Sequence, residues 1–240
     1  MRFRTPPDHL PELMDAPDCD VGELAAALDA LAHAGRVLGD DRLLRRRVAR
    51  VVGNPGTTNG NVLRVLDVGA GGGDGSVALR NDLARAGWEP HFVLSDLHAQ
   101  TLELCRGRVH KRLGADAHVR YVRLDGTRLP FAENAFDLAI CTRTLHHLSD
   151  DEAASFISDL DRVARLGWVV TDLWRSPRTL LAVRLLAATI WRRHRFPRTD
   201  GPISVRRSFT PREIRSLLAK LEITSARVRA GVVRWEAWSG

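Results

Sequence analysis

One short stretch of the chain constrains its fold more than any other. Residues 65–68 (Val-Leu-Asp-Val) have the composition of a strand, and they run directly into the turn Gly69-Ala70-Gly71-Gly72-Gly73. A helical pattern begins just after this turn, at residues 76–79. At such a junction an α/β sheet brings bare backbone against a ligand, because glycine has no Cβ to hold the ligand away. The stretch therefore predicts an α/β fold with a ligand site at the glycine turn.

Strands and helices alternate on both sides of this turn. The patterns predict strands over 64–69, 91–97, 119–125, 136–142 and 168–174, with helices between them over 75–86, 99–113 and from a cap at Ser149. A hairpin over 223–229 and 234–238 closes the chain. Alternation of this kind is typical of a parallel sheet with helices on both faces.

Additional helices are predicted outside this alternation. Two of them precede a Pro/Gly linker at 54–60, namely 20–38, with Asp20 as its N-cap, and 42–50. After the fifth strand we expect a long helix through Trp191, a Pro/Gly-marked loop over 196–208 and a helix capped by Thr210. We therefore expect an N-terminal helical cap segment at 1–60 and a main domain at 61–240, with a cap insertion at about 174–208.

Composition favours a globular protein of the cytoplasm. The chain has 240 residues, 44% of them hydrophobic, which is enough for a full α/β core. No run reaches the roughly 18 apolar residues that span a bilayer, and the first ten residues lack an apolar signal segment. The three cysteines form neither a disulfide framework nor a zinc pattern.

The positive charge is a weak argument for a nucleic-acid partner. The net charge is +7, but all but two of the 36 basic residues are arginine, a skew that GC-rich coding produces whatever the function. Few aromatic residues lie among the basic ones, so a stacking surface for single strands is not evident. Nucleic-acid binding is therefore not favoured.

The residues around the glycine turn decide among its candidate ligands. The dinucleotide pattern G-x-G-x-x-G fails because Asp74 occupies its last position, and no Gly-Lys-Ser/Thr follows for a phosphate loop. Asp67 precedes the first glycine by two residues and would repel a phosphate. S-adenosylmethionine carries an ammonium and a sulfonium but no phosphate, so its charge suits this carboxylate.

Polar residues at the ends of the following strands suit the same ligand. Asp96 ends the second strand, where a carboxylate can accept hydrogen bonds from both ribose hydroxyls. Asp125-Gly126 ends the third strand, where an acceptor can take the adenine amino group, and Thr142 and Arg143 end the fourth. Open α/β sheets bind ligands at this carboxyl rim.

Over roughly residues 62–239 the chain resembles the class I S-adenosylmethionine-dependent methyltransferases. The resemblance rests on 66–73 (Leu-Asp-Val-Gly-Ala-Gly-Gly-Gly), Asp96, 124–131 (Leu-Asp-Gly-Thr-Arg-Leu-Pro-Phe) and 136–140 leading into Leu145-His146-His147-Leu148. It implies a Rossmann-like seven-stranded sheet of order 3-2-1-4-5-7-6, with the last strand antiparallel. It also implies cofactor-binding residues, which are Asp67, Gly69, Ala70, Gly71 and Gly73 for the methionine part, Asp96 for the ribose, Asp125 and Gly126 for the adenine, and in addition Leu97 and Thr142.

The class of methyl acceptor is indicated mainly by motifs that the sequence lacks. The Asn/Asp-Pro-Pro-Tyr/Phe motif of amino-group methylases and a Pro-Cys nucleophile are both absent after the fourth strand. This favours a small molecule held under a cap. Residues 173–177 and 204–210 resemble bacterial small-molecule methyltransferases encoded with type III polyketide synthases, which implies a phenolic or quinone-like product of secondary metabolism.

The helix predicted over 179–191 has a broad apolar surface and ends in Arg192-Arg193-His194-Arg195. It can be a core helix whose basic end interacts with the helix dipole, a wall of an apolar acceptor pocket, or a peripheral membrane contact. The residues alone do not choose among these three.

For O-methylation, His146 is the first candidate for a general base and His147 the second, because histidine titrates near neutral pH and both follow the fourth strand. Alignment alone can also serve for an acidic phenol. No metal-ligand cluster is evident in the sequence. The main hypothesis is O-methylation of a hydrophobic phenol or quinol, and the alternatives are C-methylation of a quinone precursor, RNA methylation and a non-catalytic cofactor-binding partner module.

Overall fold

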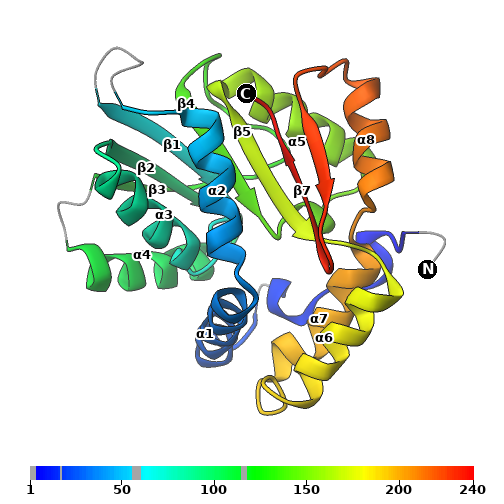
Figure 1. Ribbon diagram of the computed structural model, residues 1–240. Helices are drawn as coiled ribbons and strands as arrows, with labels where there is room; N and C mark the ends of the chain where they lie inside the picture. Colours follow the sequence, from blue (N-terminus) through cyan, green and yellow to red (C-terminus); the bar gives the residue numbers. More distant parts are fainter. Residues whose placement is uncertain (1–3, 17, 56–60, 115–117) are drawn as a thin grey trace.

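The computed structural model describes residues 4–16, 18–55, 61–114 and 118–240. A seven-stranded sheet forms its centre, in the order β3-β2-β1-β4-β5-β7-β6 (Figure 1). Neighbouring strands are parallel except where β7 pairs with β5 and with β6. This confirms the predicted order and the antiparallel last strand. The strands are β1 (Val62–Val68), β2 (Glu89–Asp96), β3 (Val119–Arg123), β4 (Phe136–Thr142), β5 (Ala164–Leu173), β6 (Arg227–Ala230) and β7 (Arg234–Trp238).

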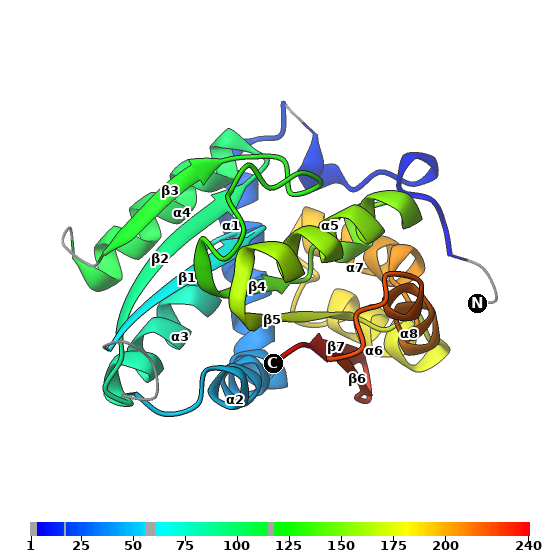
Figure 2. The same cartoon turned by 90° about the horizontal axis from the view of Figure 1, so that it is seen from above.

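Helices cover both faces of the sheet (Figures 1 and 2). On one face, apolar side chains of α2 (Asp40–Val52), α3 (Asp74–Arg85) and α4 (Ala99–Leu113) form a core cluster with the sheet. On the other face, α5 (Asp150–Val163) and α8 (Pro211–Lys220) form a second cluster. Ser149 and Thr210 cap these last two helices with complete capping boxes, as their sequences predict.

A cap lies beyond the carboxyl edge of the sheet, at the bottom of Figure 1. It consists of α1 (Val21–Leu38), α6 (Pro177–Ala188) and α7 (Arg195–Arg207), together with the N-terminal strap, residues 4–16, which contains the 3-10 turns η1 (Pro7–His9) and η2 (Leu13–Asp15). Two small apolar clusters join these elements. The division into a cap segment at 1–60 and a main domain stays a prediction, and within that segment α2 packs on the sheet rather than in the cap.

The predicted loop over 196–208 is wrong, because α7 occupies this segment. Pro197 falls in the first turn, where backbone N–H groups have no intrahelical acceptor, so only Pro202 removes a helical hydrogen bond. Gly201 marks close packing instead of a turn: a Cβ there would lie 2.9 Å from Val183 Cγ1 of α6 and 3.1 Å from Trp191 Cζ3. Tertiary packing therefore outweighs the local Pro/Gly signal.

The helix expected to run through Trp191 ends three residues earlier, at Ala188. Thr189 leaves the helical conformation, and its hydroxyl donates back to the Leu185 carbonyl at 2.6 Å. The following turn returns Trp191 to the interior, where its indole N–H donates to the Ala30 carbonyl of α1 at 3.4 Å. The bend thus joins α6 to α1.

Candidate functional site

A cavity of about 820 Å³ lies between the carboxyl edge of the sheet and the cap. The sheet contributes the turn at 69–72, the strand ends at 96–98 and 124–126 and the loop after β4, while α1, the start of α2, α6, α7 and the N-terminal strap contribute most of the remaining walls. Ligand pockets commonly measure about 300–1,000 Å³. The cavity lies near the upper end of that range, so it has room for a cofactor and a small acceptor together.

The glycine turn is held tightly at one wall of this cavity. Gly69 and Gly71 have φ of +74° and +53°, in the left-handed region that favours glycine. The N–H groups of Gly69 and Ala70 both donate to the Ser95 carbonyl, at 2.9 and 2.8 Å. A Cβ on Gly69 would lie 2.8 Å from Thr144 Cγ2, so the turn also contacts the loop after β4.

Asp67 is a buried carboxylate with an unsatisfied oxygen. Its Oδ2 accepts a hydrogen bond from the Ser76 hydroxyl, whereas Oδ1 has no hydrogen-bond partner among the described residues. Burial raises the pKa of Asp67 to about 7, against the opposing effect of the Ser76 hydrogen bond. A cationic ligand group at this wall would satisfy the free oxygen and favour the charged form.

Asp96 lies at the end of β2, beside the turn. Its Oδ2 accepts the Gly71 N–H and its Oδ1 accepts the His98 N–H, both at 3.1 Å. Each carboxylate oxygen keeps a second lone pair, so the side chain can still accept from two ligand hydroxyls. Burial raises the pKa of this carboxyl, while the two backbone donors oppose the shift.

Asp125 and Gly126 bound the cavity at the end of the next strand along the sheet. Asp125 is exposed, and its Oδ1 accepts the Thr127 N–H at 2.9 Å. A Cβ on Gly126 would approach Val68 Cγ1 to 3.1 Å, so this glycine lets the chain lie flat against the end of β1.

The structure brings together nearly all the predicted cofactor residues. Those that line the cavity are Asp67, Gly69, Ala70, Gly71, Asp96, Leu97, Asp125, Gly126 and Thr142. Gly73 is the exception, because it lies behind the turn. A Cβ there would lie 2.7 Å from Val109 Cγ2 and 2.8 Å from Cys105 Sγ. Its glycine serves the packing of α3 against α4.

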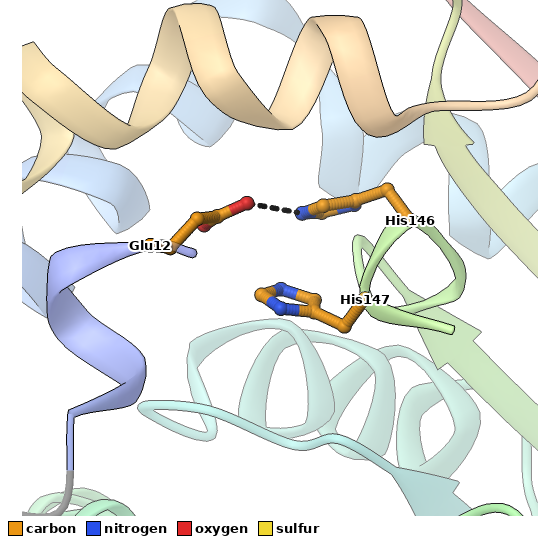
Figure 3. A group of neighbouring side chains, drawn as sticks. All are labelled: Glu12, His146 and His147. Carbon is orange, nitrogen blue, oxygen red and sulfur yellow. Dashed lines mark ion pairs between the residues drawn. The ribbon is translucent and has the colours of Figure 1, made fainter. Parts of the chain in front are cut away.

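His146 is buried between two carboxylates. Its Nδ1 lies 2.9 Å from Asp172 Oδ1, its backbone N–H donates to Asp172 Oδ2 at 2.9 Å, and its Nε2 lies 3.5 Å from Glu12 Oε1 (Figure 3). Burial alone would lower the pKa of His146, but Asp172 and then Glu12 outweigh it and raise the pKa to about 10. His146 is therefore an imidazolium at neutral pH.

His147 has a different environment, although its ring centroid lies only 4.2 Å from that of His146. Its Nδ1 lies 2.9 Å from Asp15 Oδ2, and its side chain, 27% exposed, lines the cavity. The hydrogen bond and the charge of His147 lower the pKa of Asp15, although burial alone would raise it. The Asp15 carboxylate thus holds the ring by Nδ1, and Nε2 is left as the second ring nitrogen.

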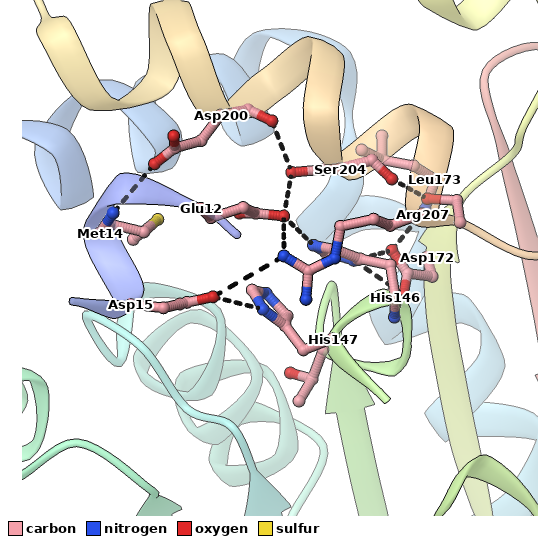
Figure 4. A network of polar contacts seen from close by, with 12 residues as sticks. Glu12, Met14, Asp15, His146, His147, Asp172, Leu173, Asp200, Ser204 and Arg207 are labelled. Atoms are coloured by element: carbon pink, nitrogen blue, oxygen red, sulfur yellow. Dashed lines mark hydrogen bonds and ion pairs between the residues drawn. The ribbon is translucent and has the colours of Figure 1, made fainter. Parts of the chain in front are cut away.

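A polar network ties the N-terminal strap to α7 and to these histidines (Figure 4). Glu12 Oε1 accepts from the Ser204 hydroxyl at 2.9 Å and from Arg207 Nη1 at 3.3 Å. The Asp200 carboxylate accepts the N–H groups of Leu13 and Met14 at 2.9 and 3.0 Å. Neither strap acid could be found from the sequence, since nothing in residues 4–16 indicates contact with side chains 130 or more positions away.

Glu12, His146 and His147 also have the residue types of a metal site. They place one donor atom each within 4.8 Å of one another. However, Glu12 Oε1 already faces the fixed positive charge of Arg207 as well as the Ser204 hydroxyl. We therefore describe the group as an ion-pair network, and the absence of a metal site stays a prediction.

Comparison with known proteins identifies the domain. Residues 65–167 match the family model described as a methyltransferase domain. This stretch is similar to methyltransferase domains in sequence, and the fold around it is that of the class I S-adenosylmethionine-dependent methyltransferases. Over 104 residues it is 36% identical to the ubiquinone/menaquinone biosynthesis C-methyltransferase UbiE of Xanthomonas campestris. This match covers 43% of the chain and 39% of UbiE, so the chain spans well under half the length of that curated relative.

Solved structures share the fold of this methyltransferase domain. A SAM-dependent methyltransferase from Aquifex aeolicus superposes with a TM-score of 0.60 at 18% identity, covering 90% of this chain and 97% of that one. Human N-acetylserotonin methyltransferase in complex with SAM superposes with a TM-score of 0.62 at 17% identity, covering 98% of this chain and 59% of that one. The carboxylates and glycines at the sheet edge suit S-adenosylmethionine, since the free Asp67 oxygen matches its cationic end and Asp96 keeps lone pairs for hydroxyls.

Proposed function

We propose that the chain transfers the methyl group of S-adenosylmethionine to the hydroxyl oxygen of a small, largely apolar acceptor, such as a phenol or quinol. The cavity supports this proposal because its two halves differ. The sheet edge presents carboxylates and backbone, whereas α1 and α6 present apolar side chains, among them Leu28, Leu31, Ala182 and Leu186, and the polar groups of the cap gather on the strap and α7. A phenolic product of a polyketide pathway has the chemistry that such a cap accepts.

The observation that carries the proposal is the His147–Asp15 pair at the cavity wall. When bound, S-adenosylmethionine supplies a methyl group on a sulfonium, which reacts with an oxygen nucleophile. His147 Nε2 would accept the hydroxyl proton of the acceptor, and the Asp15 carboxylate at Nδ1 would stabilise the resulting imidazolium. His147 therefore replaces His146 as the first candidate base, because His146 already holds its proton between Asp172 and Glu12.

A panel of phenols and quinols with methyl-labelled S-adenosylmethionine tests this proposal. We expect His147→Ala to lower turnover at pH 7 by about 10²-fold, the usual contribution of a general base, and Asp15→Asn to lower it less. The loss should shrink for phenols that ionise below neutral pH. His110→Ala, an exposed histidine on α4, is the matched control. Unchanged turnover of His147→Ala at pH 7 would remove His147 from the mechanism.

C-methylation is a second candidate, favoured by the 36% identity to UbiE over 104 residues. An activated ring carbon also loses a proton after methylation, so the same His147–Asp15 pair could serve it. The two reactions differ in the product. If an acceptor whose hydroxyl groups are blocked as ethers still gains a labelled methyl group, the new bond is to carbon and the O-methylation proposal is wrong.

A further inference from the structure

The outer surface of the cap carries exposed apolar side chains. Leu181 and Leu185 of α6 are 61% and 59% exposed, and Ile190 in the turn after α6 is 41% exposed. Leu181 and Leu185 lie one helical turn apart, so they share a face of α6. Large apolar side chains grouped on one solvent-facing surface point to a partner that covers them.

The same segment is strongly basic. Residues 173–199 contain seven arginines and no acidic residue. Six of these arginines are exposed, and the acidic residues that flank the segment, Asp172 and Asp200, are each only 2% exposed. The only ion pair that this exposed set forms with an acid in the structure's described part is Arg195 with Glu23, at 3.6 Å. The surface is therefore complementary to a negatively charged partner that also accepts apolar side chains.

The apolar surface continues into the cavity. Leu185 lines the cavity although it is 59% exposed, and so does Leu38 at the end of α1, which is 47% exposed. Both side chains must therefore lie at the rim. An acceptor that approaches along this rim enters the cavity between apolar side chains.

We propose that the cap face, defined as Leu181, Leu185, Ile190 and the arginines at 178, 184, 192 and 193, docks on an anionic lipid surface and receives the acceptor from it. The leucines would enter the boundary between head groups and acyl chains, and the arginines would contact lipid phosphates. Docking is peripheral, since none of the helices in the described ranges is long and apolar enough to span a membrane. The inference rests on the proposed function only for the nature of the acceptor.

Co-sedimentation of the full chain with vesicles tests the docking itself. We expect binding to vesicles of phosphatidylglycerol and phosphatidylcholine that weakens as salt rises, and much weaker binding to phosphatidylcholine alone. The double variant Leu181→Ser/Leu185→Ser should bind at least 10-fold more weakly. Arg192→Gln/Arg193→Gln should lose about 5-fold per arginine.

Two control variants carry the same chemical changes away from the cap. Arg46→Gln/Arg50→Gln alters two exposed arginines of α2, and Val62→Ser alters an exposed apolar residue at the start of β1. We expect both to bind vesicles as the parent chain does. Thermal melting establishes that each variant is folded, and methyl transfer to a water-soluble phenol without vesicles is measured separately, so failure of the enzyme and failure of docking are distinguishable.

Three outcomes would overturn the inference. The first is equal binding to neutral and anionic vesicles. The second is an equal loss with the α2 variant, which would mean that overall charge alone drives binding. The third is tighter binding to single-stranded RNA than to vesicles with no effect of the leucine changes, which would assign the cap face to nucleic acid.

Discussion

The buried His146 imidazolium should make the stability of the protein fall as the pH rises above neutral. His146 has a pKa of about 10 in the folded protein, whereas histidine in an unfolded chain titrates near 6.5. Its stabilising contribution is therefore complete below about pH 6.5 and is lost progressively as the pH rises toward 10. The groups that face it are Asp172 on β5, Glu12 on the N-terminal strap, His147 beside it and, through Glu12, Arg207 on α7.

The size of this pH effect on the free energy of unfolding follows from the titration of one proton. Where the native state holds one proton that the unfolded chain has released, the free energy of unfolding falls by about 1.4 kcal/mol per pH unit. This dependence is best measured in the window from pH 7.5 to 8.5. Below it, the Asp67 pKa of about 7 adds a slope of its own. Toward its upper end the buried thiols of Cys105 and Cys141, whose pKa values burial raises, begin to add another of the same sign, because a thiol in the unfolded chain titrates near 8.5.

Urea denaturation at several pH values in this window measures the slope directly. Asp172→Asn should remove most of it and should cost about 3–5 kcal/mol at pH 7, because it breaks a buried ion pair. His147→Gln leaves the Asp172 pair in place and should keep the slope. A wild-type free energy of unfolding that stays constant from pH 7.5 to 8.5 would refute the assignment of His146 as a buried cation.

Two further predictions concern the cofactor wall. Gly69→Ala places a Cβ at φ +74° and 2.8 Å from Thr144 Cγ2, so it should cost about 2–4 kcal/mol of stability in chemical denaturation, and Thr144→Ala in the same chain should recover part of this loss. Asp96→Ala should weaken binding of S-adenosylmethionine about 10- to 100-fold in calorimetry through lost hydrogen bonds to a charged acceptor, and unchanged affinity would exclude Asp96 from the site.

The sheet and the gathering of polar residues and glycines at its carboxyl edge could be predicted because their signals are local. A strand that runs into Gly69 and Gly71 is typical of a ligand-binding turn in an α/β sheet. The acids at the ends of later strands meet at one edge once the strands are parallel. Strand order came from the family resemblance, since nothing local to a strand specifies its neighbour. Gly73 could not be separated from its neighbours, because it shares their left-handed backbone conformation, with φ of +73°, and only the closeness of Val109 and Cys105 on α4 shows that it lies behind the turn.

The histidine environment and α7 could not be predicted, because distant residues determine them. His146 is followed directly by His147 in the sequence, yet Asp172 and Glu12 make one a buried cation while Asp15 holds the other at the cavity wall. Likewise, Pro202 and Gly201 are typical of a loop, and only the packing of α7 on α6 makes a helix favourable there.

The N-terminal strap has a consequence for the order in which the chain folds. Asp15 contacts His147, 132 positions later, and Glu12 contacts Ser204, 192 positions later. The strap is thus unable to reach its final place until α7 has been made. Contacts this distant in sequence are slow to form. We therefore expect refolding in which the sheet acquires protection from hydrogen exchange first and the strap last, so that newly made molecules pass through a stage with a complete sheet and an open cavity.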